Sequence, residues 1–208
     1  MIFISPERFS AECHFLLQQR NCNQNDGFGR GWSFSYHIKY RNDSAGAKTI
    51  IWGDGREDLY TLPENGIFKS PRGFFDTLTQ YQPGKYSLVH ADGIKFIFDN
   101  STHKRITRIE DPNSNFINFT YTDTLLTSVT NAAGQSVSFT YTNGKLTAAT
   151  DAIATPVRSY TYTYDGGGNL TQVTDPLNNT TKYSYLVNGP MKTMTDKNNN
   201  KADIVYFQ

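Results

Sequence analysis

The 208-residue chain has no long apolar run, only two cysteines and almost no net charge. Its apolar runs are all shorter than the roughly 18 residues that a membrane-spanning helix needs, so we expect no membrane span. Basic and acidic residues nearly balance, at 20 and 19, which leaves a net charge of +1. Without a basic excess, neither nucleic acid nor an anionic membrane has electrostatic support as a partner.

The N-terminal residues carry the two cysteines and little else with a recognisable chemistry. Cys13 and Cys22 can form a disulfide or remain free thiols, and two cysteines do not fix the compartment. Together with His14 they lack a fourth ligand at a usual metal spacing, so we predict no metal site. Pro6 and Glu7 stand where a signal peptide needs an unbroken apolar stretch, so we expect no signal peptide in this chain.

Helical spacing of apolar residues occurs in one short stretch, ERFSAECHFLLQQRN (7–21). Phe9, Cys13 and Leu16 lie there at i, i+4 and i+7, so we expect any helix to fall within residues 8–20. After Gly27 the pattern changes to alternation with a period of two. The segment WSFSYHIKY (32–40) has an aromatic or aliphatic residue at every second position, which predicts a single half-buried strand.

From residue 105 onward the sequence repeats itself five times. Each repeat opens with an apolar anchor, has an acid or amide five positions later, and closes with a tyrosine. The steps between successive anchors are 20, 20, 24 and 21 residues. The anchors are Ile106, Leu126, Leu146, Leu170 and Met191; the acids or amides are Asp111, Asn131, Asp151, Asp175 and Asp196; and the tyrosines are Tyr121, Tyr141, Tyr164, Tyr185 and Tyr206.

Each repeat is long enough for two strands and two turns. Threonine and tyrosine suit a β-sheet that is half exposed to solvent, and Asn143-Gly144 between alternating segments is a strong hairpin signal. We therefore predict an all-β fold of consecutive antiparallel β-hairpins in a curved, spiralling sheet, with the closing tyrosines on one face. Three regions are expected: an irregular or helical segment at 1–26, a lead-in β region with irregular early repeats at 27–104, and five hairpin repeats of 20–24 residues at 105–208.

One acidic turn, GDGRED (53–58), could suggest the carboxylate pair of a glycosidase. Such pairs normally come from separate elements around a bound sugar, whereas Gly-Asp-Gly is first a turn signature. Asp54, Glu57 and Asp58 are therefore interpreted as turn residues. We predict no catalytic residue in the chain and do not expect it to be an enzyme.

Other candidate sites also favour a structural interpretation. The glycine-rich GFGRG (27–31) precedes a predicted strand, although a nucleotide-binding loop needs a helix there. The calcium-like DKNNNKADIVYF (196–207) has Lys201 and Phe207 where glycine and glutamate should stand. The four histidines are scattered along the chain. We predict no cofactor and no metal.

The repeats resemble the RHS/YD-repeat family. The LTxVTD anchors, the paired aromatics and the segment YTYDGGGNLTQVTDP (162–176), with its Tyr164-Asp165 pair, carry the resemblance. The segment GFGRGWSFSY (27–36) resembles the lead-in before such repeats. The resemblance covers residues 27–208 and implies a β-sheet that spirals into a hollow shell. In bacterial members the shell encloses a toxic C-terminal domain, and related teneurin-type animal proteins use a similar barrel for adhesion.

We therefore expect a non-enzymatic segment of a partial YD-repeat shell that encloses or presents a polypeptide such as a toxin domain. The alternatives are an extracellular adhesion or carbohydrate-binding module with exposed aromatics and, more remotely, a glycosidase. The full-length protein is expected to be secreted or at the cell surface. Since the chain stops within a repeat, we expect a fragment whose partner is the rest of a longer chain or its enclosed domain. We also expect self-association through the apolar C-terminal edge DIVYFQ (203–208).

Overall fold

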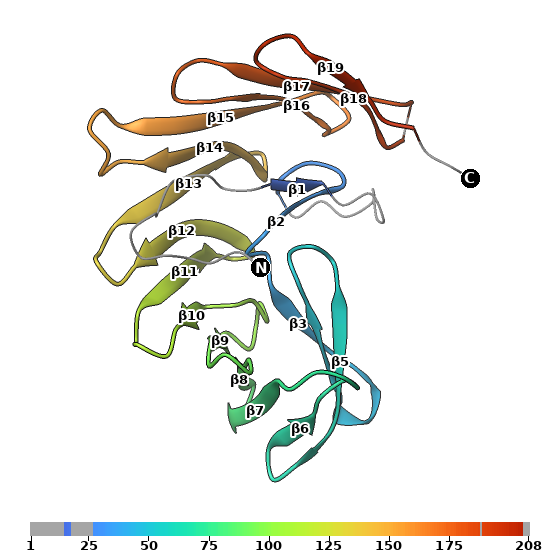
Figure 1. Ribbon diagram of the computed structural model, residues 1–208, viewed down its shortest axis with the longest axis vertical. Helices are drawn as coiled ribbons and strands as arrows, with labels where there is room; N and C mark the ends of the chain where they lie inside the picture. Colours follow the sequence, from blue (N-terminus) through green and yellow to red (C-terminus); the bar gives the residue numbers. More distant parts are fainter. Residues whose placement is uncertain (1–14, 18–26, 188, 206–208) are drawn as a thin grey trace. The chain divides into compact units, whose positions relative to one another are not determined.

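The computed structural model describes residues 15–17, 27–187 and 189–205 (Figure 1). These residues form β-strands joined by turns, together with a 3-10 turn at Ser44–Gly46 and no α-helix among them. The predicted all-β class with consecutive antiparallel hairpins is confirmed.

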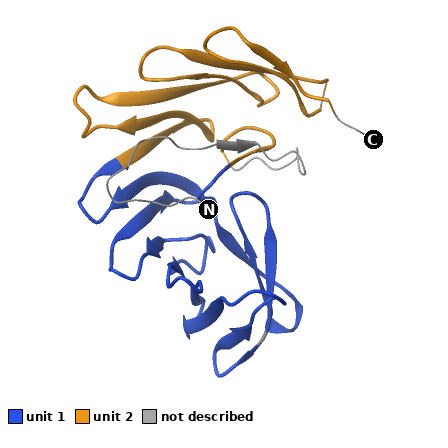
Figure 2. Cartoon of the chain, viewed as in Figure 1, with its two compact units in different colours: residues 1–14, 34–136 blue, residues 15–33, 137–208 orange. Residues whose placement is uncertain are grey.

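The chain divides into two compact units (Figure 2). Unit 1 contains residues 1–14 and 34–136, and unit 2 contains residues 15–33 and 137–208. Unit 2 therefore combines segments that are far apart in the sequence. The three-part division of the sequence at residues 26 and 104 stays a prediction.

Unit 1 is a run of strands in which each pairs with the next in antiparallel fashion. The strands are β3 (Lys39–Asn42), β4 (Lys48–Ile51), β5 (Glu57–Glu64), β6 (Ile67–Lys69), β7 (Thr77–Gln82), β8 (Lys85–Val89), β9 (Lys95–Phe98), β10 (Arg108–Glu110), β11 (Phe116–Thr122) and β12 (Leu125–Asn131). Alternate residues face the interior, as in β8, where Tyr86 and Leu88 are buried. The most buried side chains are Ile50, Tyr60, Leu78, Leu88, Phe98 and Ile106.

Unit 2 contains the later hairpins, which also pair in chain order. They are β13 (Ser136–Thr142), β14 (Lys145–Asp151), β15 (Arg158–Tyr164), β16 (Leu170–Thr174), β17 (Thr180–Tyr185), β18 (Met191–Thr195) and β19 (Lys201–Asp203). A separate two-stranded sheet joins β1 (Phe15–Leu17) to β2 (Trp32–Phe34). Its strand β2 follows the glycine-rich segment that the sequence analysis singled out.

The structure corrects three local predictions. Residues 15–17 form a strand, so a helix across this stretch is wrong at these positions, and residues 8–14 and 18–20 lie outside the described residues. A short isolated helix is marginal in water, whereas pairing with β2 satisfies the backbone directly. At the C-terminal end, a strand along the expected edge DIVYFQ is wrong at Ile204 and Val205, because β19 ends at Asp203; residues 206–208 lie outside the description.

The segment 32–40 is two strands rather than the predicted one. The chain turns at Ser35 and Tyr36, where the backbone N–H of His37 donates to Phe34 O at 2.8 Å. Gly53 lies against this turn so closely that an added Cβ would stand 2.3 Å from Ser35 O. Alternation alone could not reveal the break, since it continues in phase on both sides of the turn.

Candidate functional site

The repeat anchors form the apolar interior of the hairpins. Each of the last four anchors is the first or second residue of a strand, and all four are buried: Leu126, Leu146, Leu170 and Met191. Ile106 is also buried, but it precedes β10 and its backbone N–H donates to Ile38 O at 2.9 Å. Burying one such aliphatic side chain contributes about 1.5–3 kcal/mol, and the hairpins also bury other apolar side chains such as Val137 and Phe139.

A β-bulge recurs beside four of the five anchors, Leu126, Leu146, Leu170 and Met191. In β11–β12, Thr120 pairs with Ser128 and Tyr121 with Leu126, so that Thr127 is the extra residue. The same shift occurs before Tyr141, Tyr164 and Tyr185. A bulge leaves backbone groups unpaired, and it increases the local twist of the sheet.

Threonine hydroxyls complete three of these bulges. The Oγ1 atoms of Thr127, Thr147 and Thr171 donate to the carbonyls of Thr120, Thr140 and Thr163 at 3.2, 3.2 and 3.1 Å. In the fourth bulge the equivalent residue is Lys192. The sequence analysis missed this role, although a threonine directly follows four of the five anchors and was its visible signal.

The acids and amides five positions after the anchors begin tight turns. The carboxylate of Asp175 accepts hydrogen bonds from Leu177 N and Asn179 N at 2.8 Å and from Asn179 Nδ2 at 2.8 Å. We call this arrangement of an acid or amide with the amide side chain four residues later the turn clasp. It recurs in the pairs Asp111–Asn115, Asn131–Gln135, Asp165–Asn169, Asp175–Asn179 and Asp196–Asn200.

The turn clasp also affects ionisation. The hydrogen bond from the Asn179 side chain is the main cause that lowers the pKa of Asp175, and the Asn200 side chain does the same for Asp196. Asp151 departs from this pattern. It begins a longer turn, in which it accepts from Ile153 N and Ala154 N and pairs with Arg158 at 3.3 Å.

The closing tyrosines of unit 2 lie near one another and take part in packing. Burial raises the pKa of Tyr164, and the neighbouring hydroxyls of Tyr141 and Tyr185 raise it further. Burial raises the pKa of Tyr185 to about 12. Tyr121 belongs to unit 1, and Tyr206 lies outside the described residues.

The segment Gly27–Ser33 lies across three strands of unit 2, and we call these residues the lead-in segment. Leu146 N donates to Gly27 O at 2.7 Å, and Arg30 N donates to Gly168 O at 3.2 Å. The indole N–H of Trp32 donates to the hydroxyl of Tyr185 at 2.8 Å. That hydroxyl donates in turn to Leu170 O at 2.7 Å. The lead-in segment thus ties β14, β16 and β17 together.

The close packing of the lead-in segment against Tyr164 and Leu170 depends on Gly29. Its φ of +101° is one that side chains rarely adopt, and an added Cβ would stand 3.1 Å from Tyr164 Cε1 and 3.3 Å from Leu170 N. Trp32 packs edge-to-face on Tyr183, with ring centroids 4.9 Å apart, and is 7% exposed. We call the surface formed by Leu146, Tyr164, Gly168, Leu170, Tyr183 and Tyr185 the lead-in face.

The acidic turn GDGRED contributes to the interior of unit 1. Asp58 is 5% exposed; it accepts from the Trp52 indole at 2.5 Å and pairs with Arg56 at 3.0 Å. The Arg56 guanidinium also lies over the rings of Trp52 and Phe74, at 4.8 and 5.5 Å from their centroids. Asp54 accepts from Arg56 N at 2.9 Å. The Asp58 carboxylate therefore stabilises the turn between Trp52 and Arg56.

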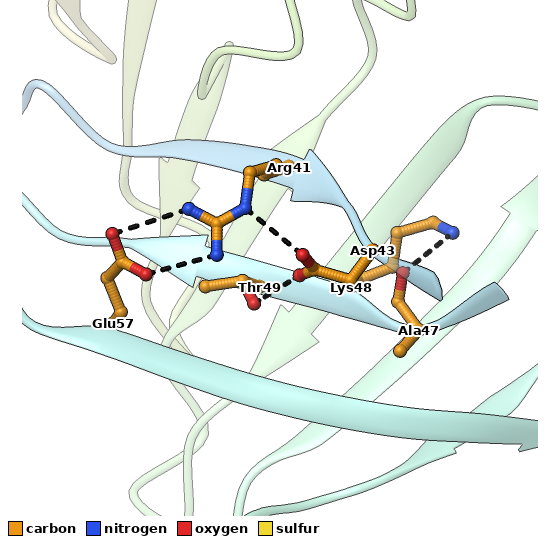
Figure 3. Close-up of polar contacts among 6 residues, drawn as sticks. All are labelled: Arg41, Asp43, Ala47, Lys48, Thr49 and Glu57. Atoms are coloured by element: carbon orange, nitrogen blue, oxygen red, sulfur yellow. Dashed lines mark hydrogen bonds and ion pairs between the residues drawn. The ribbon is translucent and has the colours of Figure 1, made fainter. Parts of the chain in front are cut away.

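Glu57 belongs to a second charged network on β3, β4 and β5 (Figure 3). Arg41 donates to both oxygens of Glu57, at 3.4 and 3.1 Å, and pairs with Asp43 at 3.2 Å. Thr49 donates to the other oxygen of Asp43. Lys48 points the opposite way, with its ammonium donating to Gly46 O at 2.8 Å and to Ala47 O at 3.3 Å.

Lys48 is a buried cation held by backbone oxygens and aromatic rings. It is 8% exposed, and its Nζ lies 5.5 Å from the centroid of Phe68 and 5.6 Å from that of Tyr86. Burial lowers the pKa of Lys48, and the positive charge of Lys104 lowers it further. The burial of Lys48 could not be read from the sequence, because a lysine at the start of a short strand ordinarily predicts exposure.

The described residues contain no group of three or more His, Cys, Asp or Glu side chains that could hold a metal ion. Cys13, His14 and Cys22 lie outside that part of the chain. His37 is buried against the Arg105 guanidinium, and His90 packs on the rings of Trp52 and Phe96. The calcium-like segment from Asp196 is a clasped turn followed by β19.

No helix in the described part of the chain is long and apolar enough to span a membrane. None of the curated proteins compared with the chain matches it. The family model described as RHS Repeat matches residues 142–180, which contain β14, β15, β16 and the clasped turn at Asp165. This match and the recurring hairpins support an assignment of these residues to the RHS repeats.

Proposed function

We propose that the chain is a non-enzymatic wall segment of an RHS-type shell that encloses or presents a polypeptide, such as a toxin domain. The RHS repeat is a structural repeat rather than an enzyme family, and such repeats are typically extracellular or at the cell surface. The observation that carries the proposal is the recurring hairpin, with its buried anchor, bulge and turn clasp. A repeat of this kind extends a sheet by adding units.

The proposed setting is a secreted or cell-surface protein whose other parts complete the wall. Its partners are then the remainder of a longer chain or the domain that the wall encloses. Self-association through the C-terminal edge remains a proposal as well. It is tested by light scattering of Val205→Pro, since proline removes a backbone donor needed for further pairing.

Two alternatives have less support. An adhesion module that binds sugars needs aromatic rings free to stack, whereas Trp32 donates to the Tyr185 hydroxyl, which donates in turn to Leu170 O. A glycosidase needs carboxylates directed at a substrate, whereas Asp58 is bound by Trp52 and Arg56.

Protection from proteolysis tests the wall. The longest natural polypeptide that contains this chain is treated with protease as wild type and as Leu146→Asp. We expect the enclosed polypeptide to resist digestion in the wild type and to be digested in the variant, because a charge at a fully buried anchor disrupts its hairpin.

The matched control is Leu177→Asp, at a turn residue that is 81% exposed, and it should leave the protection intact. Equal digestion of the wild type and Leu146→Asp would argue against the wall. Binding to immobilised glycans that disappears in Tyr141→Ala would favour the adhesion alternative.

A further inference from the structure

Two hairpin turns in the described part of the chain consist of the same Asn-Gly pair. Asn143-Gly144 joins β13 to β14, and Asn65-Gly66 joins β5 to β6. Both residues of each pair have a positive φ, of 52° and 72° in the first turn and of 51° and 81° in the second. Each pair is therefore the whole loop of a two-residue hairpin, a conformation that Asn-Gly favours. A third pair begins at Asn188, which lies outside the described residues.

An asparagine that precedes a glycine can react spontaneously with the backbone of its neighbour. The glycine nitrogen attacks the side-chain Cγ of the asparagine, so that an N–Cγ bond forms and the Cγ–Nδ2 bond breaks. Ammonia leaves with the proton that the glycine nitrogen gives up. Glycine favours this step because it has no Cβ to hinder the approach. Water then opens the resulting succinimide at one of its two carbonyls, which gives either aspartate or isoaspartate.

Hydrogen bonds hold several other asparagine side chains in one orientation. Asn131 accepts from Gln135 N at 3.0 Å through Oδ1 and donates to Gln135 Oε1 at 2.8 Å through Nδ2. Asn100 accepts from His103 N at 2.8 Å. Asn143 is exposed, and its side chain makes no hydrogen bond to any described residue. Its Cγ can therefore turn toward the nitrogen of Gly144 without losing a partner.

The two Asn-Gly loops differ in how firmly the glycine is held. Gly66 O accepts a hydrogen bond from Gln80 N of β7 at 2.8 Å, and an added Cβ at Gly66 would stand 3.2 Å from Gln80 O. Gly144 makes no hydrogen bond to any described residue, and an added Cβ there meets nothing within 4 Å. The backbone rotation that brings nitrogen to Cγ must therefore disturb a contact with a third strand at Gly66 but not at Gly144.

We propose that Asn143 is the site at which the folded chain deamidates first, through a succinimide with Gly144, and that the isoaspartate product opens the β13–β14 hairpin. The aspartate product leaves the main chain unchanged, and Asp-Gly also favours this loop. Isoaspartate instead places the side-chain methylene in the main chain, which lengthens a loop closed directly by the pair Thr142 and Lys145. The proposal concerns this turn alone and does not depend on what an RHS-type shell encloses.

The rates at the two turns of the wild-type chain test the site. The chain is incubated in mildly alkaline buffer, and the peptides that contain Asn65 and Asn143 are followed by mass spectrometry for conversion of amide to acid. A parallel sample in guanidinium chloride measures the two pairs without the fold, and their rates should be similar there. In buffer we expect Asn143 to react about fivefold faster, the ratio expected when one more hydrogen bond adds about 1 kcal/mol to the barrier.

The matched control is Asn143→Gly, since Gly-Gly also suits the loop and lacks the reactive amide. This variant should show no conversion at the turn. Hydrogen exchange in β13 and β14 should be faster in the purified isoaspartate product than in the wild type, and unchanged in the aspartate product and in Asn143→Gly. A rate at Asn65 equal to or above that at Asn143 in buffer would overturn the assigned site. An isoaspartate product with unchanged exchange would overturn the opening of the hairpin.

Discussion

Unit 1 and unit 2 are both antiparallel β-structures, but their interiors differ in charge. Unit 1 buries His37, Lys48, Asp58 and Arg105, whereas the one buried polar residue among the described part of unit 2 is Thr193. Each buried charge of unit 1 has its own arrangement of partners, such as the rings and carbonyls around Lys48. In unit 2 the same few interactions recur in successive hairpins.

This difference shows two ways of specifying a β-sheet. Unique buried polar contacts fix one register and one neighbour, and removing one partner leaves the other unsatisfied. Repeated contacts of modest strength instead allow hairpins to be added, with stability approximately a sum over units and their interfaces. The irregular early strands and the regular later ones follow from these two kinds of interior.

The largest effect should come from a repeat anchor. Leu146→Ala removes a side chain that is fully buried, and we expect a loss of about 2–5 kcal/mol of stability. Hydrogen exchange should accelerate in β13–β16 and remain unchanged in β4–β8, because repeat units can open locally. The control is Ile153→Ala, at a side chain that is 53% exposed. Uniform acceleration across both units would remove the distinction between them.

An intermediate effect is expected from a buried charge of unit 1. Asp58→Ala leaves the Trp52 indole N–H and the Arg56 guanidinium without their shared acceptor, at a cost of about 1.5–3 kcal/mol. The fluorescence of Trp52 should shift as its surroundings become wetter. Asp54→Ala, in the same turn but exposed, provides the control for denaturant unfolding. Similar losses in both variants would mean that the buried position of Asp58 is unimportant.

The smallest effect should come from a single turn clasp. Asp175→Ala removes three hydrogen bonds at a partly exposed site, with an expected loss of about 1 kcal/mol or less. The Asn179 side chain lowers the pKa of Asp175, so the folded state favours the charged form. The stabilisation is therefore present above the usual carboxyl value of 3.8 and is lost as the pH falls through the lowered pKa.

The clasp prediction is checked by thermal unfolding between pH 2 and pH 7. The difference between wild type and Asp175→Ala should shrink toward acid pH, and a double-mutant cycle with Asn179→Ala should show coupling at neutral pH. A difference that grows on acidification would contradict the assigned direction of the pKa shift.

Much of the repeat architecture could be predicted because its signals are local. Ile106 and Leu126 begin a series of anchors at nearly constant spacing, and Asn143-Gly144 specifies a hairpin through its backbone preferences. Four of the five residues that begin the clasped turns were also visible, since an acid or amide recurs five positions after the anchors; Asp165 is the exception. The fold class followed from these features without any long-range contact.

The remainder depends on contacts between distant residues. The Trp32–Tyr185 hydrogen bond and the close approach of Gly53 to the turn at Ser35 have no local sequence pattern. The alternation in WSFSYHIKY is the same with or without that turn. Likewise, a lysine at the start of a strand ordinarily predicts exposure, whereas Lys48 is buried among backbone oxygens and aromatic rings.

The lead-in segment also has a consequence for synthesis of the chain. A ribosome makes Trp32 long before Tyr185, and 153 residues at roughly 5–20 residues per second correspond to roughly 8–30 seconds. During that interval, Trp32 has no completed lead-in face to cover it. The lead-in segment is therefore among the first parts of unit 2 to be synthesised and among the last to find its contacts.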